Sequence, residues 1–219
     1  QLKTYKRRYL VCATFAFNSV ANAMMWISFA PIQSTAADYF HVSQDLINLF
    51  SMVFMMAYVP GSILCAYTFK RYYLRKSFIF SSLFQCIGAV LRFVATLDFI
   101  VNNSGSKHLS YILVLIGQSM AALVQPYYTN SPARIPAEWF SKEGRDVATA
   151  ILSIINPLGI GLGSVIPTLF VTTDGNKLYG FTGIMLLELV LCFVGCILTL
   201  LFFYDKPPTA PSLSQKLKE

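Results

Sequence analysis

The sequence predicts an all-α membrane protein with six transmembrane helices, and its composition, its apolar segments and its charge distribution support this. Hydrophobic residues make up 55% of the 219-residue chain and charged residues only 12%, with a mean hydropathy of +0.57. Soluble domains carry about 25% charged residues, so an ordinary soluble class is excluded. The basic residues lie in short runs between apolar segments and form no exposed basic face, which argues against a nucleic-acid partner.

Six apolar segments are long enough to cross a bilayer as helices, because about 20 residues at 1.5 Å rise span its core. The first lies within Tyr5–Pro31, after the basic cluster Lys6, Arg7 and Arg8. The others are expected at about 45–69, 77–97, 110–130, 147–171 and 181–203, with polar loops at 32–44, 98–109, 131–146 and 172–180 and a basic turn at 70–76. This divides the chain into a basic segment (1–8), a six-helix bundle (9–203) and a proline-rich tail or linker (204–219).

Lysine and arginine indicate the orientation of the bundle. The N-terminus, 70–76, 134–145 and the tail, which would share one side of the membrane, hold 14 of the 17 basic residues. Cytoplasmic loops carry such an excess, so both chain ends are expected in the cytoplasm of a multi-pass protein of the plasma membrane. Asn102, which begins an Asn-Asn-Ser triplet in an outer loop, is then a candidate glycosylation site.

Polar residues recur every fourth position along the first predicted helix, at Thr14, Asn18, Asn22 and Trp26. Residues four apart are neighbours on a helix surface, so they form a polar and aromatic stripe. The stripe has two interpretations. It either hydrogen-bonds neighbouring helices, as polar residues do in membrane bundles, or faces a water-filled cavity with Trp26 as a ligand wall.

The fourth predicted helix carries a second polar face, formed by Gln118, Gln125 and Thr129. Uncharged amides suit a neutral or cationic solute better than an anion, although they too can serve helix–helix hydrogen bonding. Together with Asn18, the residues expected to line a cavity are Tyr58, Gln118, Tyr128, Thr129 and Asn156.

Two further pairs of residues predict contacts between helices. Arg92 and Glu188 are charged residues inside predicted spans at matching depths, and intramembrane charges are usually paired, so a structural ion pair is expected. Gly159 and Gly163 are spaced by four residues, a pattern that lets a second helix approach closely.

Catalytic and metal-binding patterns are not found, so an enzyme, a metal site and a cofactor are not expected. The five cysteines lie inside apolar segments, where they are typical of small core residues. His41 and His108 fall in outer loops, away from a cavity where haem could bind.

Several segments resemble the feline leukaemia virus subgroup C receptor family, which are major facilitator transporters of solute carrier family 49. The resemblance is carried by YKRRYLV, NAMMWISFAPIQ, LINLFSMVFMMAYVPG, LVQPYYTNSPARIPAEWFSKEGRDVATA, NPLGIGLGSVIP and KPPTAPS. It implies the N-terminal six-helix half of a twelve-helix transporter, with a C-terminal half as partner. It also implies a choline-like substrate bound by Trp26, Asn22 and Gln125. The basic turn departs from the family pattern, with Lys70 in place of Asp and Tyr73 in place of Gly.

Three functions are therefore considered. The first is transport of a small organic cation such as choline or ethanolamine by alternating access, with Trp26 attracting the ammonium group through its ring face. The second is haem or porphyrin export by the same family. The third is a six-helix membrane scaffold or regulatory subunit without transport activity.

Overall fold

The computed structural model describes residues 5–97, 107–171 and 177–209, with the side chains of 107 and 177–179 left aside. Within these ranges the chain is helical and contains no strand. Its elements are α1 (Arg7–Ile27), the 3-10 turn η1 (Ala30–Ile32), α2 (Gln33–Phe40), α3 (Gln44–Val94), α5 (Lys107–Thr129), α6 (Arg134–Trp139), α7 (Lys142–Phe170) and α8 (Lys177–Phe202). In the described part of the chain, five helical segments are long and apolar enough to cross a membrane.

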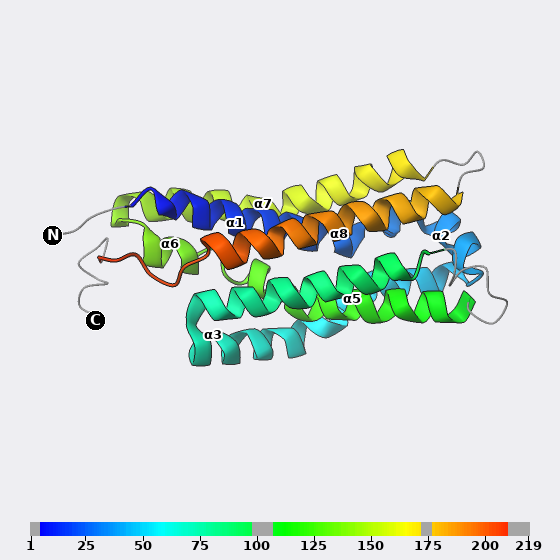
Figure 1. Cartoon of the computed structure of the whole chain (residues 1–219), viewed down its shortest axis with the longest axis horizontal. Coiled ribbons are helices and arrows are strands. Elements are labelled where there is room, and N and C mark those ends of the chain that lie inside the picture. The colour runs from blue at the N-terminus through cyan, green and yellow to red at the C-terminus, as the bar shows by residue number, and fades with distance from the viewer. Residues whose placement is uncertain (1–4, 98–106, 172–176, 210–219) are drawn as a thin grey trace.

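Helix α3 contains two of the six predicted spans, because it turns back on itself at Tyr73. This residue has φ 58° and ψ −164°, a non-helical conformation in the middle of a 51-residue helical stretch. Figure 1 shows the two parts of α3 running in opposite directions, with α5 beside them. Six apolar segments thus cross the bundle, and the all-α membrane fold predicted from the sequence is confirmed.

The two ends of the described chain lie at the same end of the bundle (Figure 1). The hydroxyl of Tyr5, before α1, lies 3.2 Å from Oγ1 of Thr209, after α8. An even number of crossings requires this arrangement. It is also the arrangement that the distribution of lysine and arginine predicts.

Two segments expected as polar loops contain helices instead. In residues 32–44, α2 forms because Ala36, Ala37 and Phe40 are buried at the end of the bundle away from the chain termini. Phe40 meets the ring of Phe29 at 6.3 Å. In residues 131–146, α6 buries Ile135 and Trp139. Each helix is too short to show a clear hydrophobic period, so tertiary packing decides its conformation.

The interior has many large aromatic side chains at both ends and a group of alanines in the middle. The terminal layers contain Phe15, Phe69, Phe78, Tyr127, Trp139 and Phe203 at one end, and Phe29, Phe40, Phe50, Tyr111 and Phe181 at the other. The middle layer contains Ala21, Ala89, Ala121 and Ala122, beside Met25, Phe54 and Cys192. Since apolar side chains gain little by leaving lipid for protein, close van der Waals packing of such small residues holds membrane helices together.

The glycine pair of α7 forms one of these close approaches, against α1. A Cβ atom added at Gly159 would lie 2.9 Å from Cα of Val20, and one at Gly163 would lie 2.8 Å from Cα of Met24. Both distances are too short for ordinary contact, so only glycine lets the two backbones come this close.

Candidate functional site

An open depression of about 440 Å³ gathers aromatic and amide side chains from four helices. It is lined by Trp26 of α1, Phe54, Met55 and Tyr58 of α3, Gln125 and Thr129 of α5, and Asn156 of α7. Of the residues proposed from the sequence, the structure therefore brings together Trp26, Tyr58, Gln125, Thr129 and Asn156. The volume lies in the range of small-molecule sites, about 300–1,000 Å³.

The aromatic side of this depression is held in place by hydrogen bonds to neighbouring elements. The indole Nε1 of Trp26 donates to the backbone carbonyl of Ser51 at 3.2 Å. Its ring lies 6.2 Å from that of Phe54, with an angle of 31° between the planes. The hydroxyl of Tyr58 donates to Oδ1 of Asn130 at 2.7 Å. These bonds fix both rings through their polar atoms, which leaves the ring faces for apolar or cationic groups.

The amide side of the depression keeps unused hydrogen-bonding capacity. The side chain of Gln125 lines the depression with 6% of the residue exposed, and the hydrogen bond described for this residue is to its backbone carbonyl, from Thr129 Oγ1 at 3.3 Å. Nδ2 of Asn156 is buried and has no partner within the described ranges. Buried polar groups are normally hydrogen-bonded, so an unpaired amide at a cavity wall is suited to a ligand or water.

The residues of the polar stripe of α1 lie in different environments. Four residues advance a helix by about 400°, so the positions from Thr14 to Trp26 rotate by roughly 120° around the axis. Asn18 is buried against α8, where Nδ2 donates to the carbonyl of Gly195 at 3.1 Å and to Thr199 Oγ1 at 3.0 Å. Only Trp26 reaches the depression, so the stripe combines helix–helix bonding with a cavity wall.

Asn22 lies behind this wall. It is fully buried, and its Nδ2 donates to the carbonyl of Ala121 in α5 at 3.0 Å and to Oε1 of Gln85 in α3 at 3.3 Å. Gln85 in turn donates to the sulfur of Cys192 in α8 at 3.4 Å. Asn22 therefore joins four helices in the bundle interior and is not among the residues that line the depression.

Two other residues proposed to line the cavity are also directed into the bundle. Nε2 of Gln118 donates to the backbone carbonyl of Met25 at 2.9 Å, and Gln118 is fully buried. The hydroxyl of Tyr128 lies 3.2 Å from that of Ser81, with its ring packed against Phe15 and Phe78. Both side chains hold α5 to its neighbours.

Arg92 and Glu188 form an ion pair beneath the last turn of α1. Nη2 of Arg92 lies 2.8 Å from Oε2 of Glu188, and both residues are almost completely buried. The guanidinium also donates to Ser28 Oγ at 2.9 Å and to the carbonyl of Met25 at 3.4 Å. Because the final carbonyls of a helix lack internal partners and carry partial negative charge, Arg92 and Gln118 together cap the end of α1 next to Trp26.

The remaining expectations concern glycosylation and metals. Asn102 lies outside the described residues. Within the described ranges there is no cluster of three or more His, Cys, Asp or Glu side chains that could hold a metal ion.

Sequence reasoning missed two residues of the depression, Phe54 and Met55, and the bonds that orient Trp26 and Tyr58. A signal for Phe54 is present in the sequence. Phe50, Phe54 and Tyr58 recur every fourth residue and thus form an aromatic row on one face of α3. The acceptor for Trp26 is a backbone carbonyl, for which the sequence contains no signal.

The fold and the site define a multi-pass helical membrane protein with an uncharged aromatic and amide depression in its surface. The chain belongs to the major facilitator superfamily, whose sequence profile matches residues 15–218. Members of this superfamily are membrane transporters. The chain is therefore part of a transporter family, and the family resemblance inferred from its motifs is confirmed by its relatives.

Three curated relatives cover nearly the whole chain. Solute carrier family 49 member A3 of Xenopus tropicalis is 34% identical over 215 residues, which are 98% of this chain and 43% of that protein. The choline/ethanolamine transporter FLVCR2 of Rattus norvegicus is 29% identical, covering 99% of this chain and 38% of that protein. The choline/ethanolamine transporter FLVCR1 of Felis catus is 27% identical, covering 95% and 36%. The chain thus spans about two-fifths of the length of these relatives.

Proposed function

We propose that this chain forms one half of a transporter for a small organic cation such as choline or ethanolamine. The observation that carries the proposal is the composition of the depression around Trp26. Its lining residues are aromatic, amide, hydroxyl or thioether side chains, and none of those described is charged. A Trp face attracts an ammonium group by about 0.5–2 kcal/mol, so such a wall binds a cation without a carboxylate partner.

The proposed roles follow the geometry of each side chain. Trp26 and Tyr58 contact the ammonium group through their ring faces, which are held by the bonds to Ser51 and Asn130. The amide of Gln125 and the unpaired Nδ2 of Asn156 bond the hydroxyl end of the substrate. Asn22 supports the wall from behind through its bonds to α3 and α5.

Transport is proposed to require a second six-helix half. Substrate sites of such transporters lie near the midplane between two repeats, which rock about the site to give alternating access. The depression is open on one side here, and the relatives are more than twice as long as this chain. A C-terminal half would close the depression and supply the remaining contacts. A scaffold without transport activity would leave the unpaired amide of Asn156 without a role.

Haem export is the weaker candidate for this site. Haem transport calls for an axial ligand or cationic groups for the propionates, and the described lining contains neither a histidine nor a lysine or arginine. The same absence of charge gives no advantage to anionic substrates.

Uptake of radiolabelled choline and ethanolamine by cells that express the chain together with its proposed second half tests this function. Replacing Trp26 with Leu should lower the affinity about 2- to 30-fold, because the cation–π attraction is lost. Trp26→Phe should fall between Leu and Trp, because a smaller ring still attracts a cation. Surface expression is measured in parallel, and uptake that is unchanged in Trp26→Leu at equal expression contradicts the proposal.

A further inference from the structure

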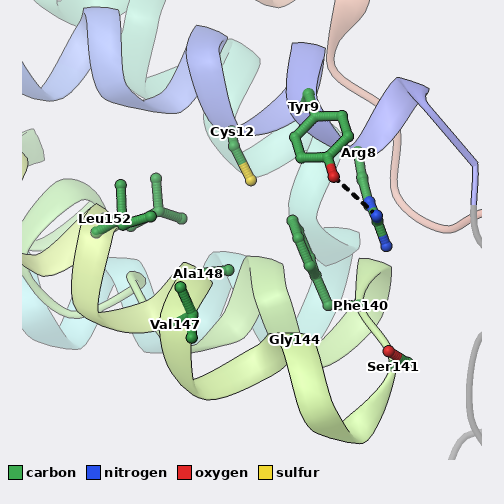
Figure 2. Close-up of a pocket in the computed structure, with 10 residues that line it drawn as sticks. Arg8, Tyr9, Cys12, Phe140, Ser141, Gly144, Val147, Ala148 and Leu152 are labelled. Atoms are coloured by element: carbon green, nitrogen blue, oxygen red, sulfur yellow. Dashed lines mark hydrogen bonds between the residues drawn. The ribbon is translucent and has the colours of Figure 1, made fainter.

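A second concave surface lies at the end of the bundle where the chain termini meet, between α1 and the start of α7. This groove encloses about 440 Å³ and is lined by Arg8, Tyr9, Cys12, Phe140, Ser141, Gly144, Val147, Ala148, Ile151 and Leu152. Figure 2 shows the sulfur of Cys12 pointing from α1 toward α7, with Val147, Ala148 and Leu152 on the opposite wall. The groove is thus apolar along its length and has a single cationic residue in its lining, Arg8.

Arg8 is held firmly at one end of this groove. Its guanidinium carbon lies 4.8 Å from the ring centroid of Tyr9 and 4.8 Å from that of Phe140. Nη2 donates to the hydroxyl of Tyr9 at 2.8 Å, as the dashed line in Figure 2 marks. Two aromatic contacts on one guanidinium restrict its rotamers, so the charge sits at a defined position beside the groove.

This positive charge is not neutralised by the described part of the chain. Arg92 is paired with Glu188, whereas no ion pair with a described residue is found for Arg8. Nε of Arg8 is buried and has no hydrogen-bond partner within the same ranges. The guanidinium as a whole is only partly covered by the fold, so its charge remains available to an anionic oxygen from outside the chain.

The position of the groove indicates where that anion comes from. Arg8 lies in the first turn of α1, beside Lys6 and Arg7, where the apolar span begins. This is the level of the lipid headgroups, and a basic residue between helices at that level recognises anionic lipid phosphates. Val147 and Ile151 are more than half exposed, so the apolar wall opens sideways and admits an acyl chain.

We propose that this groove binds an anionic glycerophospholipid, with its phosphate on Arg8 and an acyl chain along α7. The end of the groove at Arg8 suits the phosphate of such a lipid, and the apolar wall along α7 suits its acyl chain. A helix of the second transporter half is the competing occupant. It would fill the apolar part but leave the guanidinium charge of Arg8 without an anion, which makes the lipid the better match.

Native mass spectrometry of the purified transporter, with its second half present, tests the headgroup contact. Phosphatidylserine and phosphatidylcholine with identical acyl chains are titrated separately, and phosphatidylserine should bind more tightly. Arg8→Gln should weaken phosphatidylserine binding roughly fivefold to tenfold, since one cation near the headgroup is lost. Arg7→Gln removes the same charge from an exposed neighbour outside the groove and should leave binding nearly unchanged.

A second pair of variants tests the apolar part while Arg8 is retained. Gly144 lines the groove, and a Cβ added there would lie 3.5 Å from Phe140, an ordinary contact, so Gly144→Leu fills the groove without disturbing the backbone. It should weaken phosphatidylserine binding as Arg8→Gln does. Gly161→Leu adds the same side chain to α7 in open space and should have no effect. Glycerophosphoserine, which lacks acyl chains, should not displace the bound lipid.

Three results would overturn the proposal. If phosphatidylserine and phosphatidylcholine bind equally, the groove does not select an anionic headgroup. Equal losses in Arg8→Gln and Arg7→Gln reduce the effect to general surface charge. Unchanged lipid binding in Gly144→Leu, with loss of association between the two halves, assigns the groove to the second half. Circular dichroism and size-exclusion profiles that match the unmodified protein exclude misfolding in each variant.

Discussion

At the scale of single residues, the same chemical type has different roles according to what surrounds it. Gln118 and Gln125 lie on one helix, yet Gln118 caps the end of α1 through the Met25 carbonyl, whereas the side chain of Gln125 lines the depression. Arg8 and Arg92 differ in the same way. Arg92 is neutralised by Glu188, and Arg8 is held between two rings without a carboxylate in the described part of the chain.

The buried ion pair leads to a prediction at this scale. Arg92→Leu should destabilise the protein by about 3–5 kcal/mol, because the carboxylate of Glu188 is left buried and unpaired. Arg92→Leu combined with Glu188→Leu should recover much of this loss. The double variant still lacks the bonds to Met25 and Ser28, so it should remain less stable than the unmodified protein. Thermal or denaturant unfolding in micelles measures all three, and a double variant as unstable as the summed single variants contradicts the pairing.

At the scale of elements, the connections between helices contain backbone strain and specific contacts. The turn within α3 places Tyr73 at φ 58° and ψ −164°, a region that is essentially restricted to glycine. The family that the sequence resembles has glycine at this position of the basic turn, and the φ and ψ values of Tyr73 explain that preference. After the turn the backbone is bound to the C-terminal segment, with the backbone amide of Arg75 donating to Asp205 Oδ1 at 2.6 Å.

Tyr73→Gly should therefore stabilise the protein by about 1 kcal/mol, because backbone strain is released. Little packing is lost, since 65% of the Tyr73 side chain is exposed. Tyr72→Gly is the matched control: this neighbour is exposed and helical, so glycine there should destabilise by about 1 kcal/mol. Unfolding midpoints of the two variants should shift in opposite directions, and a loss of stability in Tyr73→Gly would contradict the strain.

At the scale of the whole molecule, the six membrane-spanning segments form a bundle with an apolar outer surface. Its polar side chains lie where the helices contact one another. Exposed apolar residues of α7, including Ile154, Leu158, Val165 and Leu169, suit contact with lipid or with another helical half. The depression and the groove lie at different levels of this bundle, one around Trp26 and the other around Arg8. A membrane protein whose candidate site is open on one side fits the proposal of a two-half transporter.

The proposed orientation, with both chain ends in the cytoplasm, is testable by cysteine labelling. In a background without the five native cysteines, His41→Cys should react with an impermeant maleimide on intact cells. Lys142→Cys should react only after permeabilisation, because it lies at the opposite end of the bundle, at the start of α7. Both residues are exposed, so accessibility within the fold does not bias the comparison. The reverse pattern would invert the topology.

The fold could be predicted from the sequence because hydropathy and charge act locally along the chain. The apolar segments, the depth of Arg92 and Glu188 and the spacing of Gly159 and Gly163 all depend on length and helical period, and the structure has both pairs at helix contacts. The helices α2 and α6 could not be predicted, because burial of Phe40 and Trp139 by distant residues forms them.

The candidate site was predictable only in part, for a geometrical reason. The sequence by itself determined an all-α membrane protein, its six spans and the polar face to which Trp26 belongs. Only the tertiary structure decided which polar residues reach a cavity, since Asn18 and Asn22 turn toward neighbouring helices while Trp26 does not. A spacing of four residues rotates a stripe around the helix, so the outcome depends on which neighbour each side chain meets, and that is a property of packing.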